Sequence, residues 1–492
     1  MKTHQYLTAF LLSAALVGCT KDFLEKAPLD SVNTANYYQS AEDAVNAVNA
    51  AYQPLQRPKL YNFRIWTTDI MAGNSVVGAG GGTDGIETQD LANFVTTSAN
   101  AGVLDIYRGP APGILQCNIV LQKVPAINMD ETLKNRVLGE AKFLRALYYF
   151  NLVRLFGDVP LITTPQIVGD DLRVKRAPKA EVYALIVKDL TEAIASLPPA
   201  SSYGGSDLGR ASKGAATGLL AKVYLTLGDY QKTVDLCQQV TALGYTLNNN
   251  YADNFSPTKK NTPESLFEVQ FSGATTYDFW GDFNQAAWAS TFTGPRNSDF
   301  VAGGYGWDQP TQEFVSTYEP TDLRKDITVL YPGSPPFDGK AYQSSYSSTG
   351  FNLRKFLVPK SVSPDYNTNP ENFPVLRYAD VLLMLSEALN ELGRTADAEA
   401  PLNLVRKRAG LGNIASGLSK DNFRNAVLHE RRVELAFEGQ WWFDLIRVQN
   451  GQYGINFLHS IGRLNATTKH LLLPIPQQEI DSNPNLTQNP GY

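Results

Sequence analysis

The segment at residues 430–447 constrains the fold more than any other, because it joins many large apolar side chains to many charges. Val433, Phe437 and Trp441 recur at four-residue spacing, which predicts that they share one face of a helix. The charged residues of the segment include Arg431, Glu434, Glu438, Asp444 and Arg447. Since buried charges generally need partners, we expect a structural ion-pair network that ties this segment to neighbouring helices.

Three ordered stretches of the sequence resemble those of a known family. They are ERRVELAFEGQWWFDLIR at residues 430–447, RALYYFNLVRLFGDVPL at 145–161 and LPIPQQEIDSNPNLTQNPGY at 473–492. Together with the N-terminus, they resemble the SusD/RagB family, the surface glycan-binding lipoproteins of nutrient-uptake systems, over essentially the full length. One departure is Trp441, which stands where the family often has Arg before the aromatic pair.

The composition argues against several classes of protein. The 492 residues are 43% apolar and have a net charge of −5, without a basic stripe of the kind that binds nucleic acid. Three cysteines do not make a disulfide framework, and four histidines leave no cluster for zinc. Residues 365–369 resemble the start of a calcium loop, but Pro370 replaces the required glycine and Leu376 the bidentate Glu. We therefore expect neither a metal nor a cofactor.

The N-terminus predicts export and a lipid anchor. Lys2 precedes an apolar run at residues 6–17, so residues 1–18 are typical of a secretory signal, and the run is too short to span a bilayer. The signal ends in Leu-Val-Gly-Cys, which resembles a bacterial lipobox and makes Cys19 the predicted lipidation site. Residues 19–39 then form a polar tether. We expect a mature protein that is lipid-anchored to the outer membrane and exposed on the cell surface.

Apolar periodicity predicts one mostly α-helical domain over residues 40–492. Helices are expected at residues 133–156, 179–197, 212–227, 229–243, 378–392, 395–408, 421–437 and 440–448. They form about four irregular hairpins of tetratricopeptide-like length. Such hairpins stack on one another because none of them buries its apolar face alone.

Two long inserts interrupt this helical scaffold. The scaffold is expected mainly at residues 131–245 and 377–450, and the inserts mainly at 57–115 and 246–376. The second insert is rich in Gly, Pro, Ser, Asn and Tyr and has one strand-like run at residues 266–271. Long insertions are usually disordered or functional, and the density of aromatic rings here favours function.

Aromatic residues of the second insert are the first candidates for a ligand site. They are Trp280, Trp288, Tyr305 and Trp307, and the polar residues near them are Asp278, Asp282, Asn284, Asp308 and Gln309. The apolar face of a sugar ring stacks on an aromatic plane, while its hydroxyl groups need polar partners at the rim. The alternative is that these rings plug the insert against the helical scaffold.

The first insert offers a second candidate set. Trp66, Asp69 and Asn74 lie where the family's early loops often contribute to binding, and the alternative is a buried Trp with a capped turn. Residues 80–85 match GxGxxG, but no convincing strand precedes them and no βαβ pattern surrounds them. We interpret these residues as a flexible surface loop, not as a nucleotide site.

The family resemblance implies capture of an oligosaccharide and its delivery to a SusC-like, TonB-dependent outer-membrane transporter. We found no convincingly placed GxSxG, HExxH or Ser/His/Asp pattern, so no catalytic residue is predicted and no enzyme activity is expected. Three alternatives stay open: the same role with a peptide ligand, a periplasm-facing tetratricopeptide-type scaffold, and a surface glycosidase. The last requires two facing carboxylates, which spacing along the chain cannot establish.

Overall fold

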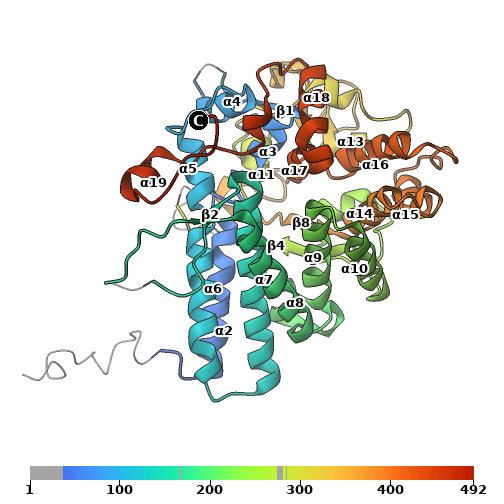
Figure 1. The fold of residues 1–492 in the computed structure, drawn as a ribbon. Coiled ribbons are helices and arrows are strands. Elements are labelled where there is room, and N and C mark those ends of the chain that lie inside the picture. The colour runs from blue at the N-terminus through green and yellow to red at the C-terminus, as the bar shows by residue number, and fades with distance from the viewer. Residues whose placement is uncertain (1–36, 82, 167–168, 274–280, 284) are drawn as a thin grey trace, which may run out of the picture.

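The computed structural model describes residues 37–81, 83–166, 169–273, 281–283 and 285–492 (Figure 1). The predicted signal, Cys19 and Trp280 lie outside these residues. Within them, helices dominate and the strands are short, which confirms the prediction of a mostly α-helical fold. None of the described helices is both long and apolar enough to cross a membrane.

The scaffold is a row of packed helices (Figure 1). It begins with α2 (Ala41–Tyr52), α6 (Ala111–Lys123) and α7 (Glu131–Phe156), which pack side by side. It continues through α8 (Lys179–Ser196), α9 (Lys213–Leu227) and α10 (Tyr230–Ala242). It ends with α14 (Tyr378–Glu391), α15 (Thr395–Arg408), α16 (Lys420–Glu434) and α17 (Trp441–Arg447). The expected hairpins are the pairs α7–α8, α9–α10, α14–α15 and α16–α17.

Capping residues begin and end these helices. Ser40 and Asp43 form a capping box at α2, in which the N–H of Asp43 donates to Ser40 Oγ at 3.1 Å and the N–H of Ser40 donates to Asp43 Oδ2 at 2.9 Å. Asp130 caps α7, since its carboxylate accepts from the N–H of Leu133 at 2.9 Å. Gly228 ends α9 in the left-handed conformation, at a φ of 76°, which glycine adopts without strain.

The first insert is more helical than expected. The sequence predicted an irregular segment at residues 57–115, but the segment contains α3 (Trp66–Met71), α4 (Ile86–Ala92) and α5 (Ala101–Arg108). These helices have six, seven and eight residues, which is too short for a convincing apolar repeat. Helices of this length depend on tertiary packing, and α3 packs against α17.

Four two-stranded antiparallel sheets lie among the described residues. They pair β1 (Ser75–Gly78) with β5 (Trp307–Pro310), β2 (Val159–Pro160) with β3 (Arg176–Ala177), β4 (Ser265–Val269) with β8 (Phe373–Arg377), and β6 (Val329–Leu330) with β7 (Asn352–Leu353). The predicted strand at residues 266–271 corresponds to β4. Its partner β8 is buried at every position, so no alternation of polar and apolar residues marks it in the sequence.

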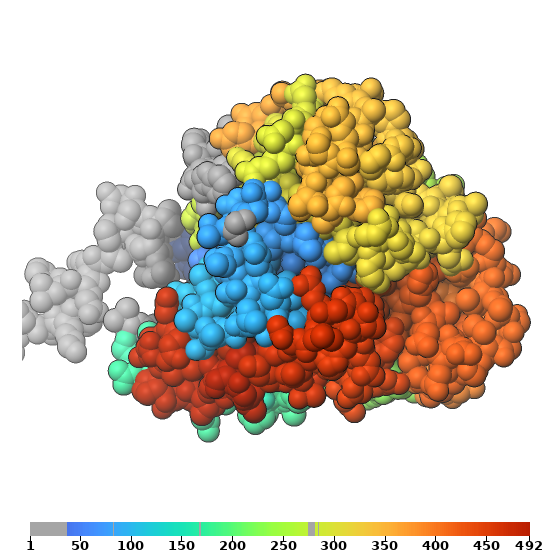
Figure 2. All heavy atoms as spheres, turned by 90° about the horizontal axis from the view of Figure 1, so that it is seen from above, coloured from blue at the N-terminus to red at the C-terminus, as the bar shows by residue number. Residues whose placement is uncertain are grey.

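Both inserts and the C-terminal segment meet at one end of the scaffold. The short elements there include α11 (Ala289–Thr293), α12 (Gln312–Val315), α13 (Lys325–Thr328) and α18 (Gln452–Ser460), whereas α19 (Gln477–Ser482) lies further out beside α5. Seen from above, the first insert (blue) lies between the second insert (yellow) and the C-terminal segment (red) (Figure 2). This end of the molecule is therefore built from loops that the scaffold holds together.

One prediction for residues 430–447 is wrong, because Val433, Phe437 and Trp441 do not lie on one continuous helix. Helix α16 ends at Glu434, Phe437 has a φ of 61°, and α17 begins at Trp441. The interruption frees backbone carbonyl groups for other partners, and Arg377 Nη2 donates to the carbonyl of Glu434 at 3.0 Å. Such long-range partners are invisible in the spacing of apolar residues.

The predicted ion-pair network around Glu434 is confirmed. Its fully buried carboxylate accepts from Arg324 and Arg377, each at 3.0 Å, and also pairs with Arg408. Burial opposes ionisation, but these guanidinium groups lower the pKa of Glu434 to about 2. Arg377 and Arg408 also bind Glu264, at 2.6 and 3.0 Å. The network thereby ties α16 to α15 and to the second insert.

A second buried cluster surrounds Arg431. Its guanidinium donates to Asp444 at 2.9 Å and to Asp380 at 2.8 Å. Asp380 also pairs with Lys222 at 2.6 Å, and Arg447 donates to Asp444 at 2.7 Å. These contacts join α16 and α17 to α14 and α9, so the charged residues of the segment act as structural links.

We expect Glu434→Ala to destabilise the fold by about 3–5 kcal/mol, because it leaves buried guanidinium groups without their carboxylate. Chemical unfolding followed by circular dichroism measures the change. Asp421→Ala is a matched control on the same helix, since its side chain is 82% exposed and its pair with Arg424 should contribute little. An unchanged free energy of unfolding for Glu434→Ala, with selective loss of ligand binding, would contradict the structural role.

Candidate ligand-binding face

Six aromatic side chains from both inserts gather where the inserts meet. They are Phe63, Trp66, Trp288, Phe292, Tyr305 and Trp307. The ring centroid of Phe63 lies 5.3 Å from that of Trp66 and 5.1 Å from that of Trp307. The ring of Phe292 lies 5.3 Å from that of Tyr305. The structure thus brings the described tryptophans of the two candidate sets into one cluster.

The cluster has a buried side and a partly exposed side. Trp66 and Trp288 are only 2% and 5% exposed, which is the position expected for rings that plug the insert against the scaffold. Tyr305 and Trp307 are half-buried. In this conformation a ligand can contact Tyr305 and Trp307, while Trp66 and Trp288 support the face from below.

The β1–β5 ladder fixes the position of Trp307. Trp307 lies opposite Gly78 in the ladder, and its ring packs against Ile70 and Val77. Gly85 approaches the same ring so closely that a Cβ there would lie 2.4 Å from Cη2 of Trp307. Only glycine permits this approach, so the close packing of the chain on the ring depends on Gly85.

A hollow of about 360 Å³ shares part of its wall with the apolar cluster against which Trp307 packs. Ile70, Val77 and Ala92 belong to that cluster and line the hollow, whereas the Trp307 ring itself lies outside the lining. Polar side chains also line it, namely Gln89, Asn93, Ser348 and Arg463. Small-molecule sites are generally about 300–1,000 Å³ and combine apolar walls with a few polar groups. The arrangement has the size and chemistry to hold a sugar residue.

Two ion pairs connect the first insert to the second. Arg296 Nη1 lies 3.7 Å from Asp84 Oδ2, and Arg57 Nη1 lies 3.5 Å from Asp282 Oδ2. The guanidinium of Arg57 also lies 5.3 Å from the ring centroid of Phe283, which is 76% exposed. Arg296, Asp84 and Asp282 are 38%, 54% and 44% exposed, so the hydroxyl groups of a ligand can reach them, whereas Arg57 is mostly buried.

Asp69 and Asn74 lie beneath the face and are 1% and 0% exposed. Asp69 Oδ2 accepts from the backbone N–H of Gly439 at 3.0 Å. Asn74 Oδ1 accepts from Arg432 Nε at 2.9 Å. Asp69 therefore joins the first insert to the chain between α16 and α17, and Asn74 joins it to α16. Both side chains position the face and do not line it.

The polar residues expected around the second insert are divided in the same way. Asp308 and Gln309 are buried, at 0% and 1% exposure, and Gln309 Oε1 accepts from the N–H of Ser348 at 2.9 Å. Asp282 lies near the surface beside Arg57. Asp278 and Asn284, like Trp280, lie outside the described residues. The buried Asp308 and Gln309 hold the loops in place, and of these polar residues Asp282 is accessible to a ligand.

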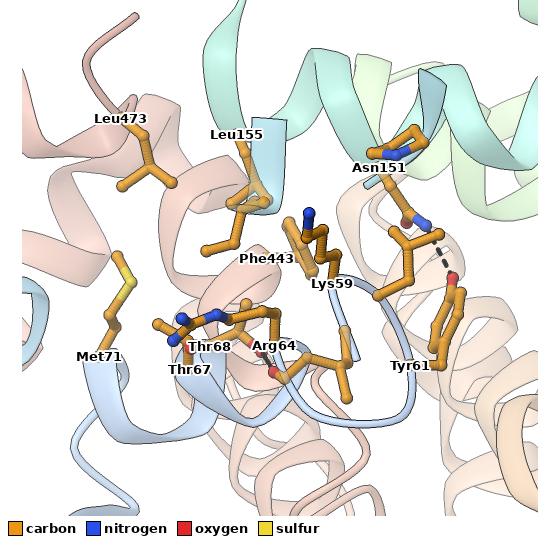
Figure 3. Close-up of a pocket in the computed structure, with 14 residues that line it drawn as sticks. Lys59, Tyr61, Arg64, Thr67, Thr68, Met71, Asn151, Leu155, Phe443 and Leu473 are labelled. Carbon is orange, nitrogen blue, oxygen red and sulfur yellow. Dashed lines mark hydrogen bonds between the residues drawn. The ribbon is translucent and has the colours of Figure 1, made fainter. Parts of the chain in front are cut away.

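Two other cavities differ in character from this face. One, of about 40 Å³, is lined by Met71, Leu155 and Phe443 among others and is too small for a sugar (Figure 3). The other, of about 1060 Å³, lies between α5, α6 and α19, and its mainly apolar walls include the exposed Leu115 and Leu172. Unlike the hollow, neither is lined by Ile70, Val77 or Ala92, the cluster against which Trp307 packs.

Sequence reasoning missed the centre of the cluster and much of its rim. Phe63 precedes Trp66 by three residues and Phe292 follows Trp288 by four, and such helical spacing was the available signal. The other residues missed are Gln89, Asn93, Arg296, Ser348 and Arg463. They come from distant segments of the chain, so no local pattern indicates that they meet.

Comparison with known proteins assigns the family. The model of the SusD family matches residues 242–492 of this chain. The chain belongs to the SusD family. A second SusD-like family model, described as starch-binding and associating with the outer membrane, matches residues 22–225. The resemblance found in the sequence is thereby confirmed.

Relatives and solved structures of the SusD family match most of the chain. SusD-like protein P2 of Formosa agariphila is 28% identical over the full length of both chains, and starch-binding protein SusD of Bacteroides thetaiotaomicron is 25% identical over 77% of this chain and 76% of that protein. A laminarin binding SusD-like protein has a TM-score of 0.82 at 31% identity and covers 93% of this chain and 100% of its own. Surface glycan-binding protein A from B. thetaiotaomicron, in complex with laminarihexaose, has a TM-score of 0.77 at 25% identity, covering 91% and 99%.

We expect single Trp→Ala substitutions to distinguish the buried rings that support the face from the partly exposed rings that a ligand can contact. Trp66→Ala and Trp288→Ala should each cost about 3–5 kcal/mol of unfolding free energy, because they remove buried rings. Trp307→Ala should cost clearly less, since its ring is already partly exposed. Thermal melting of the three variants measures the difference. Equal destabilisation by all three, or none by Trp66→Ala, would contradict the division.

Proposed function

We propose that the protein binds an oligosaccharide, without catalysis, on the face formed by Tyr305, Trp307 and the adjoining hollow. The observation that carries this proposal is the half-buried ring of Trp307 beside a hollow with polar side chains. The C–H face of a sugar ring packs on such an aromatic plane, and its hydroxyl groups bind the polar side chains. The buried rings beneath hold this surface rigid, which lowers the entropy lost on binding.

The ligands named for similar proteins support a glucan as the bound sugar. Proteins similar to this chain include one named for starch, one for laminarin and one solved with laminarihexaose. We therefore choose laminarihexaose as the first ligand to test, followed by starch oligosaccharides. The wider family description supports association with the outer membrane.

The proposed role in uptake is capture at the membrane surface followed by delivery to a SusC-like, TonB-dependent transporter. A lipid-modified Cys19 and the tether at residues 19–39 would hold the domain on the outer membrane, with residues 1–18 removed as the signal. A protein that lies over the transporter mouth and holds a glycan there raises the effective concentration that the transporter meets. This role needs binding and release, and no bond-breaking step.

We expect Trp307→Ala to weaken laminarihexaose binding about tenfold or more, equivalent to about 1.4 kcal/mol, because it removes the stacking surface. Calorimetric titration of the soluble protein from residue 20 onward measures the affinity, with circular dichroism to confirm folding. Leu172→Ala is the control, because this leucine is 62% exposed and lines the separate apolar groove.

The same titrations distinguish the possible errors. Loss of affinity in Leu172→Ala but not in Trp307→Ala would place the site in the apolar groove. A parent protein that binds peptides and none of the glycans on an array would show that the ligand class is wrong.

We expect Cys19→Ala to yield a folded protein that no longer partitions with membranes, because the predicted lipid attachment is lost. Fractionation after a high-salt wash measures this, since salt removes a protein held only by electrostatic contact with a transporter. The parent protein, treated identically, is the control. Retention of the variant in the washed membrane fraction would contradict the anchor.

A further inference from the structure

Two buried carboxyl groups, whose charges repel each other, lie beneath the proposed ligand-binding face. Asp69 of α3 and Asp308 of β5 are 1% and 0% exposed. One oxygen of each has a donor, since Asp69 Oδ2 accepts from the N–H of Gly439 at 3.0 Å and Asp308 Oδ1 accepts from the hydroxyl of Ser75. The other two oxygens, Asp69 Oδ1 and Asp308 Oδ2, have no donor among the described residues. Buried oxygens without donors are costly, and a proton on the pair removes part of that cost.

The charged groups around the pair do not compensate two ionised carboxylates. Lys355 favours ionisation of Asp69, whereas Asp308 and Glu438 oppose it. The ammonium of Lys355 is itself engaged by Glu438 at 2.6 Å. Burial raises the pKa of Asp308 to about 7, although the hydroxyl of Ser75 opposes the shift, and burial followed by the charge of Asp308 raises the pKa of Asp69. Two buried carboxyl groups that repel each other in this way do not both ionise readily, so the pair retains a proton more strongly than exposed carboxyl groups do.

The backbone connects this pair directly to Trp307. Asp308 has a φ of 56°, a left-handed conformation that is uncommon outside glycine and that Asp tolerates better than most residues. It therefore interrupts the regular strand between two ladder positions, Trp307 opposite Gly78 and Gln309 opposite Val76. The Asp308 side chain binds Ser75 on β1 while the neighbouring Trp307 ring joins the aromatic cluster.

We propose that Asp308, together with Asp69, is a positioning residue for Trp307: a proton held by the pair keeps the β1–β5 ladder closed, and its release loosens the ladder and the face. This inference rests on the proposed function insofar as it concerns ligand affinity. The effect on the ladder itself is independent of any ligand.

The direction of the pH dependence follows from the raised pKa values. In the closed ladder the carboxyl groups keep a proton that they release once the ladder opens and exposes them. The stabilisation of the closed ladder is therefore complete below the pKa of exposed Asp, about 3.9. This stabilisation declines as the pH rises and is lost as the pH passes through about 7, the pKa of Asp308 in the folded protein. Opening of β1 and β5 therefore becomes easier from acid to mildly alkaline pH.

Hydrogen exchange of the β1 and β5 amides tests the proposal. In the parent protein, protection corrected for intrinsic exchange should fall at least tenfold between about pH 5 and about pH 8.5. Asp308→Asn removes one titrating group of the pair, and Asn also accepts the left-handed conformation, so protection should depend much less on pH than in the parent, with Asp69 alone still titrating. Asp421→Asn, which changes an exposed carboxylate on α16, should behave like the parent. Equal pH dependence in the parent and Asp308→Asn would overturn the proposal.

A second variant keeps the test decisive if Asp308→Asn does not fold. Ser75→Ala removes the hydroxyl that favours ionised Asp308, so the loss of protection should move to higher pH. No movement in that variant would also overturn the proposal.

Laminarihexaose titration over the same pH range separates this inference from the proposed function. Affinity should fall with the loss of protection in the parent and fall much less in Asp308→Asn, in which only Asp69 still titrates. If protection depends on pH but the protein binds no glycan at any pH, the proposed function is wrong, whereas the pH-dependent opening of the β1–β5 ladder stands. Glycan binding that is as tight at about pH 8.5 as at about pH 5, despite lost protection, would refute the positioning of Trp307.

Discussion

The buried carboxylate of Glu434 and its guanidinium partners hold together the parts of the molecule that meet at the proposed ligand-binding face. Arg324 comes from the second insert, Arg408 ends α15 and Arg377 ends β8, so one carboxylate joins three distant segments. The network continues into Glu438, which accepts from Arg377 at 2.7 Å and from Lys355 at 2.6 Å. Since two apolar side chains can stabilise a core as well as a buried pair does, the distinctive contribution of these charges is directional bonding.

The same network explains how the scaffold positions the aromatic rings. Immediately after Glu438, the backbone N–H of Gly439 donates to Asp69 on α3. Trp66, at the start of α3, packs against Phe63, and Phe63 packs against Trp307. A continuous set of contacts thus runs from a buried charge cluster to a partly exposed ring. Long loops with this support can present a rigid binding surface, although loops generally have fewer contacts than helices.

The helical scaffold could be predicted from the sequence because its signals are local. Caps such as Ser40 and Asp130 lie within a few residues of the helix starts that they specify. The crowding of charges at residues 430–447 likewise indicated a network, but not its partners. The sequence predicted that helix α16 extends past Glu434. It ends there instead, and the partner of the Glu434 carbonyl, Arg377, is 57 residues away, so no local pattern marks this end.

The ligand-binding face could be predicted only in part, for the same physical reason. Composition and spacing indicate Trp66, Trp288 and Trp307 as candidate rings, but the burial of these rings depends on Phe63 and Phe292, which come from different inserts. Composition cannot distinguish a ring that plugs a loop from one that contacts a ligand. The β1–β5 ladder makes that distinction, because it leaves Trp307 partly exposed.

Hydrogen exchange of the soluble protein with and without saturating laminarihexaose tests the central claim most directly, because it locates a ligand without prior mutation. If the glycan binds where the two inserts meet, the amides of residues 76–93 and 296–309 should gain protection, and those around the hollow at residue 348 should follow. Residues 107–115 and 479–486, which line the separate apolar groove, should be unchanged. Protection confined to that groove, with none at Trp307 or the glycine-rich loop, would contradict the assignment of the binding face.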